Sequence, residues 1–158
     1  MARAKESSSR SSLPASRSVT ILAFDFGTNK IGVAVGDTET GMASPLSLVC
    51  AASGAARMEK IDALVREWNP GKLVVGLPLT LDGAEHDLTR RSRRFGRQLA
   101  ARFRLPVDFA DERLTSVAAE ERLRERGRGG QQHKDLVHAE AARIILQSYL
   151  DEQNASRC

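Results

Sequence analysis

The hydrophobic positions near the start of the chain form two short runs separated by a polar step. Residues 21–24 are apolar, Asp25 follows them, and a second run passes through Ile31, Val33 and Val35. This pattern predicts a β-hairpin with Asp25 at the tip of its first strand. A lone carboxylate is costly inside an apolar strand, so Asp25 must be paired, bound to a metal or placed at the strand end.

Strand and helix patterns alternate along the rest of the chain. The predicted elements are a strand at 43–50, a helix through 58–68, a strand at 72–77, a helix through 88–103, a strand at 106–110, a helix at 116–126 and a helix at 135–150. Pro45 favours an edge position for its strand. The basic, glycine-rich residues 127–134 are expected to be a loop. The order predicts an α/β fold with a mixed five-stranded sheet, three antiparallel strands and then two parallel βα units, flanked by helices.

The length of 158 residues is that of one domain with short extensions. Residues 1–18 are rich in serine and arginine and predict a disordered basic tail, 19–152 form the domain, and 153–158 are expected to be a flexible C-terminus. No apolar run is long enough to cross a bilayer. Cys50 and Cys158 are no disulfide framework, which favours a cytoplasmic protein, and Cys50 is expected in the core.

The net charge of +4 is modest, but the arginines are concentrated. In the helix through 88–103, apolar residues occupy one face and arginines nearly fill the other. Such a face is often only a solvated surface. Here few acids separate the arginines, and like charges four residues apart repel, so the pattern favours an anionic partner such as nucleic acid. The arginines concerned are Arg90, Arg91, Arg93, Arg94 and Arg97.

Four short motifs occur in a fixed order. They are residues 23–35, residues 74–79 with Asp82-Gly83, residues 111–115 and residues 144–150. Together they resemble the YqgF/RuvX family of the ribonuclease H-like superfamily, over about residues 20–151. The resemblance implies a ribonuclease H-like fold and a nuclease of ribosome biogenesis that matures the 5′ end of pre-16S ribosomal RNA. A resolvase of Holliday junctions, acting on branched DNA, is the alternative activity within the same family.

The carboxylates of these motifs are the candidate catalytic groups. Parallel strands place their carboxyl ends at one sheet edge, so Asp25 and the Asp111-Glu112 pair are expected to converge. Carboxylates that converge repel one another unless a cation such as Mg²⁺ or Mn²⁺ bridges them, and two such ions can activate water for phosphodiester hydrolysis. The resemblance implies that Asp25 and Glu112 are catalytic and bind metal. In the structural alternative, Asp111 caps backbone groups and Glu112 pairs with Arg113 or another arginine.

The third acidic position departs from the family pattern. Family proteins have an aspartate shortly before a pair of small residues in the last helix, where this chain has His138 before Ala141-Ala142. Imidazole can bind a metal or donate a proton, so His138 is a candidate catalytic residue and metal ligand. It can equally be a packed or surface histidine, with two-metal chemistry impaired. Asp135 lies one turn earlier, and Glu140 is expected to face away from His138.

The leading hypothesis is a hydrolase that cleaves nucleic acid with Mg²⁺ or Mn²⁺. The expected contacts to the nucleic acid are Lys30, Arg90, Arg91, Arg94, Arg97 and Arg113. The second hypothesis is a nucleic-acid-binding protein with little catalysis, because His138 replaces the aspartate. An actin-like or sugar-kinase ATPase ranks last, since that class encloses its nucleotide between two lobes. The sequence leaves open whether the protein is a monomer or a homodimer.

Overall fold

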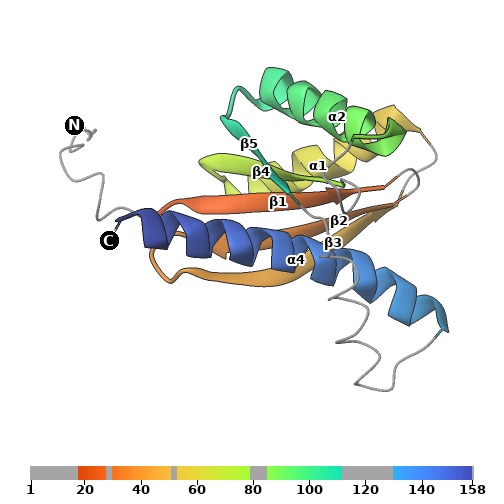
Figure 1. Cartoon of the computed structure of the whole chain (residues 1–158). Helices are drawn as coiled ribbons and strands as arrows, with labels where there is room; N and C mark the ends of the chain where they lie inside the picture. Colours follow the sequence, from red (N-terminus) through yellow and green to blue (C-terminus); the bar gives the residue numbers. More distant parts are fainter. Residues whose placement is uncertain (1–17, 28–29, 51–52, 79–84, 112–129, 158) are drawn as a thin grey trace.

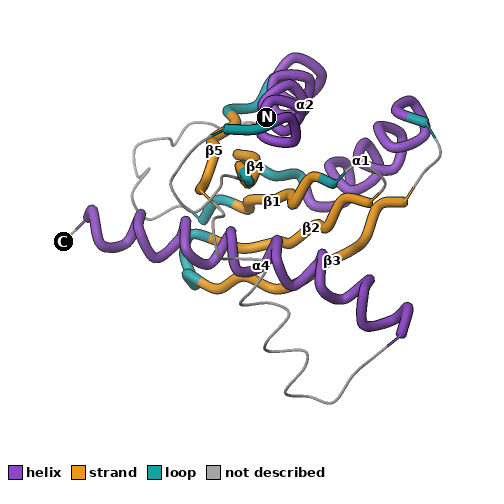
Figure 2. The backbone as a smooth tube through the Cα atoms, turned by 45° about the vertical axis from the view of Figure 1, so that its right-hand side comes forward, coloured by secondary structure: helices purple, strands orange, loops and turns teal. Residues whose placement is uncertain are grey.

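The centre of the molecule is a sheet with helices on both faces. The computed structural model describes residues 18–27, 30–50, 53–78, 85–111 and 130–157 (Figure 1). The elements are β1 (Thr20–Phe26), β2 (Lys30–Asp37), β3 (Met42–Cys50), α1 (Gly54–Trp68), β4 (Lys72–Leu77), α2 (Asp87–Phe103), β5 (Val107–Asp111) and α4 (Gly130–Arg157). Helices α1 and α2 cover one face of the sheet and α4 covers the other (Figures 1 and 2). None of these helices is both long and apolar enough to cross a membrane.

The strands form one mixed sheet in the order β3-β2-β1-β4-β5. The β1–β2 and β2–β3 pairs are antiparallel, and the β1–β4 and β4–β5 pairs are parallel, which confirms the predicted arrangement. Pro45 lies on the edge strand β3, where the register with β2 shifts. Because β1, β4 and β5 run in the same direction, they end at the same side of the sheet, here named the carboxyl edge.

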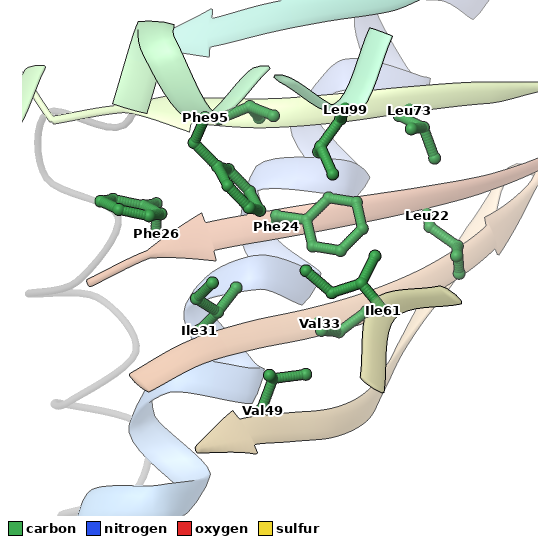
Figure 3. Close-up of a cluster of buried hydrophobic side chains, with 11 residues drawn as sticks. Leu22, Phe24, Phe26, Ile31, Val33, Val49, Ile61, Leu73, Phe95 and Leu99 are labelled. Atoms are coloured by element: carbon green, nitrogen blue, oxygen red, sulfur yellow. The ribbon is translucent and has the colours of Figure 1, made fainter. Parts of the chain in front are cut away.

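Strand β1 is buried on both faces, and its alternation separates two hydrophobic clusters. Leu22, Phe24 and Phe26 point toward α1 and α2 (Figure 3). Ile21 and Ala23 point the other way and pack with residues of α4. A fully buried leucine or phenylalanine stabilises the fold by roughly 1.5–3 kcal/mol. Packing on both faces therefore fixes β1 and the residues at its end.

Helix α4 is longer than the sequence pattern predicts. The expected range was 135–150, whereas the helix spans Gly130–Arg157, so part of the expected loop at 127–134 is helical. Its contacts with β1, β2 and β3 supply tertiary packing, which contributes more to a helix than local propensity does. Gln147 adds a polar link, because its Oε1 accepts a hydrogen bond of 3.0 Å from the backbone N–H of Ala43.

Two predicted segments cannot be compared with the structure, and one prediction about a cysteine is wrong. The predicted helix at 116–126 and residues 1–17 of the basic tail lie outside the described residues. The prediction that Cys50 is buried is wrong, since the residue is exposed. Cys50 is the last residue of β3, which is an edge strand and has a neighbouring strand on one side only.

Candidate active site

Asp25 lies at the carboxyl edge of the sheet, on the face that α4 covers. It is the last residue but one of β1 and continues the alternation that points Ile21 and Ala23 toward α4. Its side chain is only 10% exposed. A carboxylate with so little access to water needs a compensating partner. The structure thus places Asp25 at the strand end, as the sequence predicts, and also buries it.

Glycines of β2 allow the backbone of α4 to come close to Asp25. Gly32 pairs directly with Asp25 in the β1–β2 register. A Cβ atom on Gly32 would overlap the backbone carbonyl group of His138. At Gly36, on the same face of β2, a Cβ would lie 2.9 Å from Leu146. Only residues without a side chain leave room for the helix here, so the glycines position His138 beside the end of β1.

Asp25 and His138 face each other without a hydrogen bond. Nδ1 of His138 lies 3.6 Å from Oδ2 of Asp25, which is too long for a hydrogen bond. This Nδ1 is buried and has no hydrogen-bond partner among the residues that the structure describes. An unprotonated Nδ1 would direct its lone pair at a carboxylate oxygen, and a proton or a cation between the two atoms removes that repulsion. The pair therefore fits a shared cation or proton.

The turn after Asp25 has little room for a side chain near this pair. A Cβ atom on Gly27 would lie 2.6 Å from the carbonyl oxygen of Lys30 and 3.8 Å from Cε1 of His138. A larger residue would therefore collide with the hairpin backbone and crowd the imidazole. The groups nearest to Gly27 are thus the hairpin backbone and the His138 ring.

The two donors at this site differ in their metal preference. Carboxylate oxygen suits Mg²⁺ and Mn²⁺, whereas imidazole nitrogen suits transition metals better than Mg²⁺. Two ligands on one ion, each at about 2.1 Å, are at most about 4.2 Å apart, so the separation of 3.6 Å is compatible with a shared ion. The described residues contain no group of three or more His, Cys, Asp or Glu that could hold a metal. Asp25 and His138 therefore fit part of a metal site that needs another donor.

The other acidic candidates do not join this pair in the part of the chain that is described. Glu112 and the side chain of Asp135 lie outside that part. Asp111 ends β5 and is exposed at the carboxyl edge. Glu140 is buried, and its Oε2 accepts hydrogen bonds of 3.0 and 2.8 Å from Nε and Nη2 of Arg143. The charge of Glu140 is thus compensated within α4.

The predicted nucleic-acid-binding arginines of α2 lie on the opposite face of the sheet from His138. All four on α2 are exposed, namely Arg90, Arg91, Arg94 and Arg97. The N-terminal half of α2 reaches the carboxyl edge, because Arg91 and Arg94 line a pocket with Phe26. Lys30 begins β2 at the same edge, and Arg113 lies outside the described residues. Arg57 of α1 lines this pocket too, and nothing in the sequence distinguishes it from other helical arginines.

A second polar cluster lies near the C-terminal half of α4, and sequence reasoning missed it. Nζ of Lys72 donates hydrogen bonds to Oη of Tyr149 (2.8 Å) and to Oδ2 of Asp108 (3.1 Å), and the Tyr149 hydroxyl donates to Asp108. The bond to Tyr149, with that to Lys72, lowers the pKa of the Asp108 carboxyl. The bond to Tyr149 raises the pKa of Lys72, and burial raises the pKa of Tyr149. This cluster unites β4, β5 and α4.

A family model described as "RuvX: Holliday junction resolvase" matches residues 19–152 of this chain. The chain belongs to the RuvX family. Its relatives include a protein of Dechloromonas aromatica, 52% identical over 132 residues (84% of this chain, 90% of the relative), and one of Paraburkholderia phytofirmans, 50% identical over 140 residues (89% and 93%). Both carry the name "Putative pre-16S rRNA nuclease". The family resemblance predicted from the sequence is confirmed.

The fold of this RuvX-family chain is similar to that of a solved protein. Thermus thermophilus RuvC, in complex with a Holliday junction substrate, matches with a TM-score of 0.53 and 18% identity, over 87% of this chain and 97% of the RuvC chain. At this identity the likeness concerns the fold alone. It confirms the predicted ribonuclease H-like arrangement of the sheet and its flanking helices.

Proposed function

We propose that this protein is a metal-dependent nuclease that hydrolyses phosphodiester bonds in the 5′-end maturation of pre-16S ribosomal RNA, in the cytoplasm. The observation that carries the proposal is the pair of Asp25, whose side chain is nearly buried, and His138, whose buried Nδ1 lies 3.6 Å from Oδ2 of Asp25 without a hydrogen bond. Membership of the RuvX family and the names of the relatives support the substrate class.

Asp25, His138 and Glu112 are the proposed ligands of the metal. A divalent ion, Mn²⁺ or Mg²⁺, supplies an activated water and stabilises the charge on the leaving oxygen when it is bound there. Asp25 provides a fixed, nearly buried oxygen donor, because both faces of β1 are packed. Glu112 follows Asp111, the last residue of β5, and β5 lies two strands from β1, about 10 Å away. Side chains that extend from both strand ends can span that distance.

His138 has two possible roles in this site. As a neutral ligand it adds a nitrogen donor where family proteins supply a negative oxygen, so it lowers the negative charge that attracts divalent ions. As a proton donor it would protonate the leaving oxygen from Nδ1, the atom that faces Asp25. Both roles need the ring in its present position, which the contact between Gly32 and the backbone of α4 determines.

Branched DNA is the second candidate substrate. The description of the family model names a Holliday junction resolvase, and the similar RuvC structure contains a Holliday junction. A protein that binds nucleic acid with little catalysis is the remaining alternative. It is favoured by the same observation that makes the site unusual, namely that a histidine faces Asp25.

The test is a cleavage assay with two substrates. The purified full chain is incubated with an RNA that spans the 5′ end of 16S rRNA and, separately, with a four-way DNA junction, each with Mg²⁺, Mn²⁺ or EDTA. We expect cleavage of the RNA near the mature 5′ end, faster with Mn²⁺, and none with EDTA. If only the DNA junction is cleaved, the RNA nuclease proposal is wrong and the resolvase hypothesis is supported. If nucleic acid is bound and neither substrate is cleaved, the hypothesis of a binding protein with little catalysis is supported.

A further inference from the structure

The face of the sheet that carries α1 and α2 has a positively charged pocket at the carboxyl edge. Its volume is about 220 Å³. The lining residues come from the tip of β1, the start of α1 and the N-terminal half of α2, and they are Phe26, Arg57, Arg91, Arg94, Phe95 and Gln98. We name it the Arg57 pocket. It is separate from the Asp25–His138 pair, which lies on the other face of the sheet.

The charge of the Arg57 pocket is concentrated and of one sign. Arg57 comes from α1, while Arg91 and Arg94 lie one turn apart on α2. None of the described lining residues is acidic. Arg91 pairs with Asp87 at 3.1 Å, but both side chains are more than half exposed, so the pair is weak and an anion can compete for the guanidinium. Guanidinium groups that converge from two helices favour a phosphate, which their planar forks can bind with paired hydrogen bonds.

The floor of the pocket excludes a base as the bound group. Phe26 and Phe95 form it, with ring centroids 4.9 Å apart, and they are only 9% and 4% exposed (Figure 3). Rings so well covered offer no open face on which a base could stack. The Arg57 guanidinium lies over the Phe26 ring, 5.6 Å from its centroid, and this contact holds it in place at the apolar floor. A preorganised cation beside a low-dielectric surface suits a small anion.

The position of the pocket relates it to the proposed site. Phe26 directly follows Asp25 in β1, and successive strand residues point to opposite faces, so the pocket and Asp25 lie on opposite faces of the same strand tip. A groove of about 640 Å³ continues from the pocket between α1 and α2, and it includes Glu59 and Arg102. Arg102 is engaged with Asp62 of α1 at 2.6 Å. Arg57, Arg91 and Arg94 therefore concentrate positive charge at the end of the groove nearest Asp25.

We propose that the Arg57 pocket binds one backbone phosphate of the nucleic-acid strand that the protein cleaves, a phosphate other than the one attacked. The proposal rests on the proposed nuclease function for the identity of the strand. A strand that bends over the carboxyl edge contacts Asp25 on one face and the pocket on the other. The pocket thus sets the distance between an anchored phosphate and the cut.

The experiment removes one phosphate charge at a time from the RNA. Single-stranded oligoribonucleotides of one sequence, each with a neutral methylphosphonate at a different linkage, are bound to the full chain carrying Asp25→Asn, so that no cleavage interferes. We expect one linkage whose neutralisation weakens binding about fivefold to tenfold. Adding Arg57→Gln with Arg94→Gln should weaken binding of the unmodified RNA by a similar factor, remove the effect of that linkage and reduce the slope of log K against log salt by about 0.7.

Two further variants control for loss of charge and for loss of structure. Arg66→Gln removes an exposed arginine from the last turn of α1, outside the pocket, and should leave the linkage profile unchanged. Arg57→Lys keeps the charge and should keep the sensitive linkage. The proposal is overturned if Arg66→Gln and the double variant give the same profile, or if no single linkage stands out with the unaltered pocket.

The outcomes separate this proposal from the proposed function. If the unaltered chain cleaves no RNA with either metal and yet one linkage depends on Arg57 and Arg94, the pocket binds phosphate and the nuclease function is wrong. If the chain cleaves RNA and the double variant changes neither the profile nor the salt slope, the nuclease stands and the pocket proposal fails.

Discussion

Helix α4 presents polar side chains to the sheet near both of its ends, and the two groups differ in how well they are satisfied. Near the C-terminus, Tyr149, Lys72 and Asp108 each form hydrogen bonds to the other two. Nearer the N-terminus, His138 faces Asp25 at 3.6 Å, and its buried Nδ1 has no hydrogen-bond partner in the described part of the chain. The same helix on the same sheet therefore completes one polar cluster and leaves the other incomplete.

This difference separates a structural cluster from a site. An unsatisfied buried polar atom costs about 1–3 kcal/mol, so the fold is less stable at the His138 end than a completed hydrogen bond would make it. Local imperfections of this kind are expected where a ligand completes the arrangement. Substitutions at the two ends should then have opposite consequences. Substitutions in the Asp25–His138 pair should lower the cleavage activity and leave the stability of the fold unchanged. Substitutions in the Lys72–Asp108–Tyr149 cluster should lower the stability and leave the activity unchanged.

The largest effect is expected for Asp25→Asn. The amide has nearly the same shape as the carboxylate but lacks the charge that attracts a cation, so RNA cleavage should fall by at least about 100-fold, the range for loss of one charge-stabilising group in an active site. The melting temperature should stay the same or rise, because a buried charge is removed. Cleavage rates and calorimetry on the same preparation measure both. Cleavage at the rate of the unaltered chain would place the nuclease site elsewhere.

The second prediction concerns the charge at His138. His138→Asp adds a negative oxygen donor, so Mg²⁺-dependent cleavage at subsaturating metal should rise about tenfold, within the range by which donor changes alter metal affinity. Activity with Mn²⁺, which accepts imidazole, should change less. Cleavage rates measured at saturating metal report the chemical step alone, so their comparison with rates at subsaturating metal separates metal affinity from catalysis. His138→Ala is the control, and if it leaves the cleavage rate unchanged, His138 has no role in catalysis. If His138→Asp loses activity with both metals, the histidine acts as a proton donor or as a packing residue.

At the other end of α4, Tyr149→Phe tests the structural half of the comparison. The substitution removes the hydroxyl that bonds to Lys72 and Asp108, and should lower the free energy of unfolding by about 1 kcal/mol. The cleavage rate per folded molecule should be unchanged, because the cluster is at the opposite end of β4 from the carboxyl edge. Urea titration followed by circular dichroism gives the stability. A fall in cleavage rate without a fall in stability would contradict the separation of the two ends.

Local patterns predicted the strands well, because alternation along β1 and β2 is a property of neighbouring residues. The position of Asp25 at a strand tip followed from that pattern, and the parallel strand order places this tip and the end of β5 at the same edge of the sheet. The family motif, not physical reasoning, selected His138. Its actual position depends on Gly32, and a glycine in a strand signals a close approach without identifying what approaches.

Features assembled from distant segments could not be predicted. Lys72, Asp108 and Tyr149 belong to three elements, and nothing near each residue indicates the others. Arg57 joins the arginines of α2 only because α1 and α2 lie on the same face of the sheet. The early start of α4 was missed for a similar reason, since its stabilising contacts are with the sheet.

The smallest expected effect is a change in the acid stability that Asp108 provides. The pKa of Asp108 is lowered in the folded protein by its bonds to Tyr149 and Lys72. A lowered carboxyl pKa adds stability above the unfolded value of about 3.9, and this stability is lost as the pH falls through the lower, folded value. Asp108→Asn should therefore be less stable than the unaltered chain at pH 6, with a difference that shrinks as the pH falls below about 4.

The Asp108 side chain is 44% exposed to solvent, so the difference at pH 6 should be a small part of the total stability. Denaturant titrations of both proteins from pH 6 to pH 2.5 measure it. Because the Tyr149 hydroxyl is the main cause of the lowered pKa, Tyr149→Phe alone should also flatten the acid dependence, and Asp108→Asn added to it should change the dependence little. A stability difference between the unaltered chain and Asp108→Asn that is constant over this pH range would show that the cluster does not lower the pKa of Asp108, and would contradict its role as a stabilising cluster.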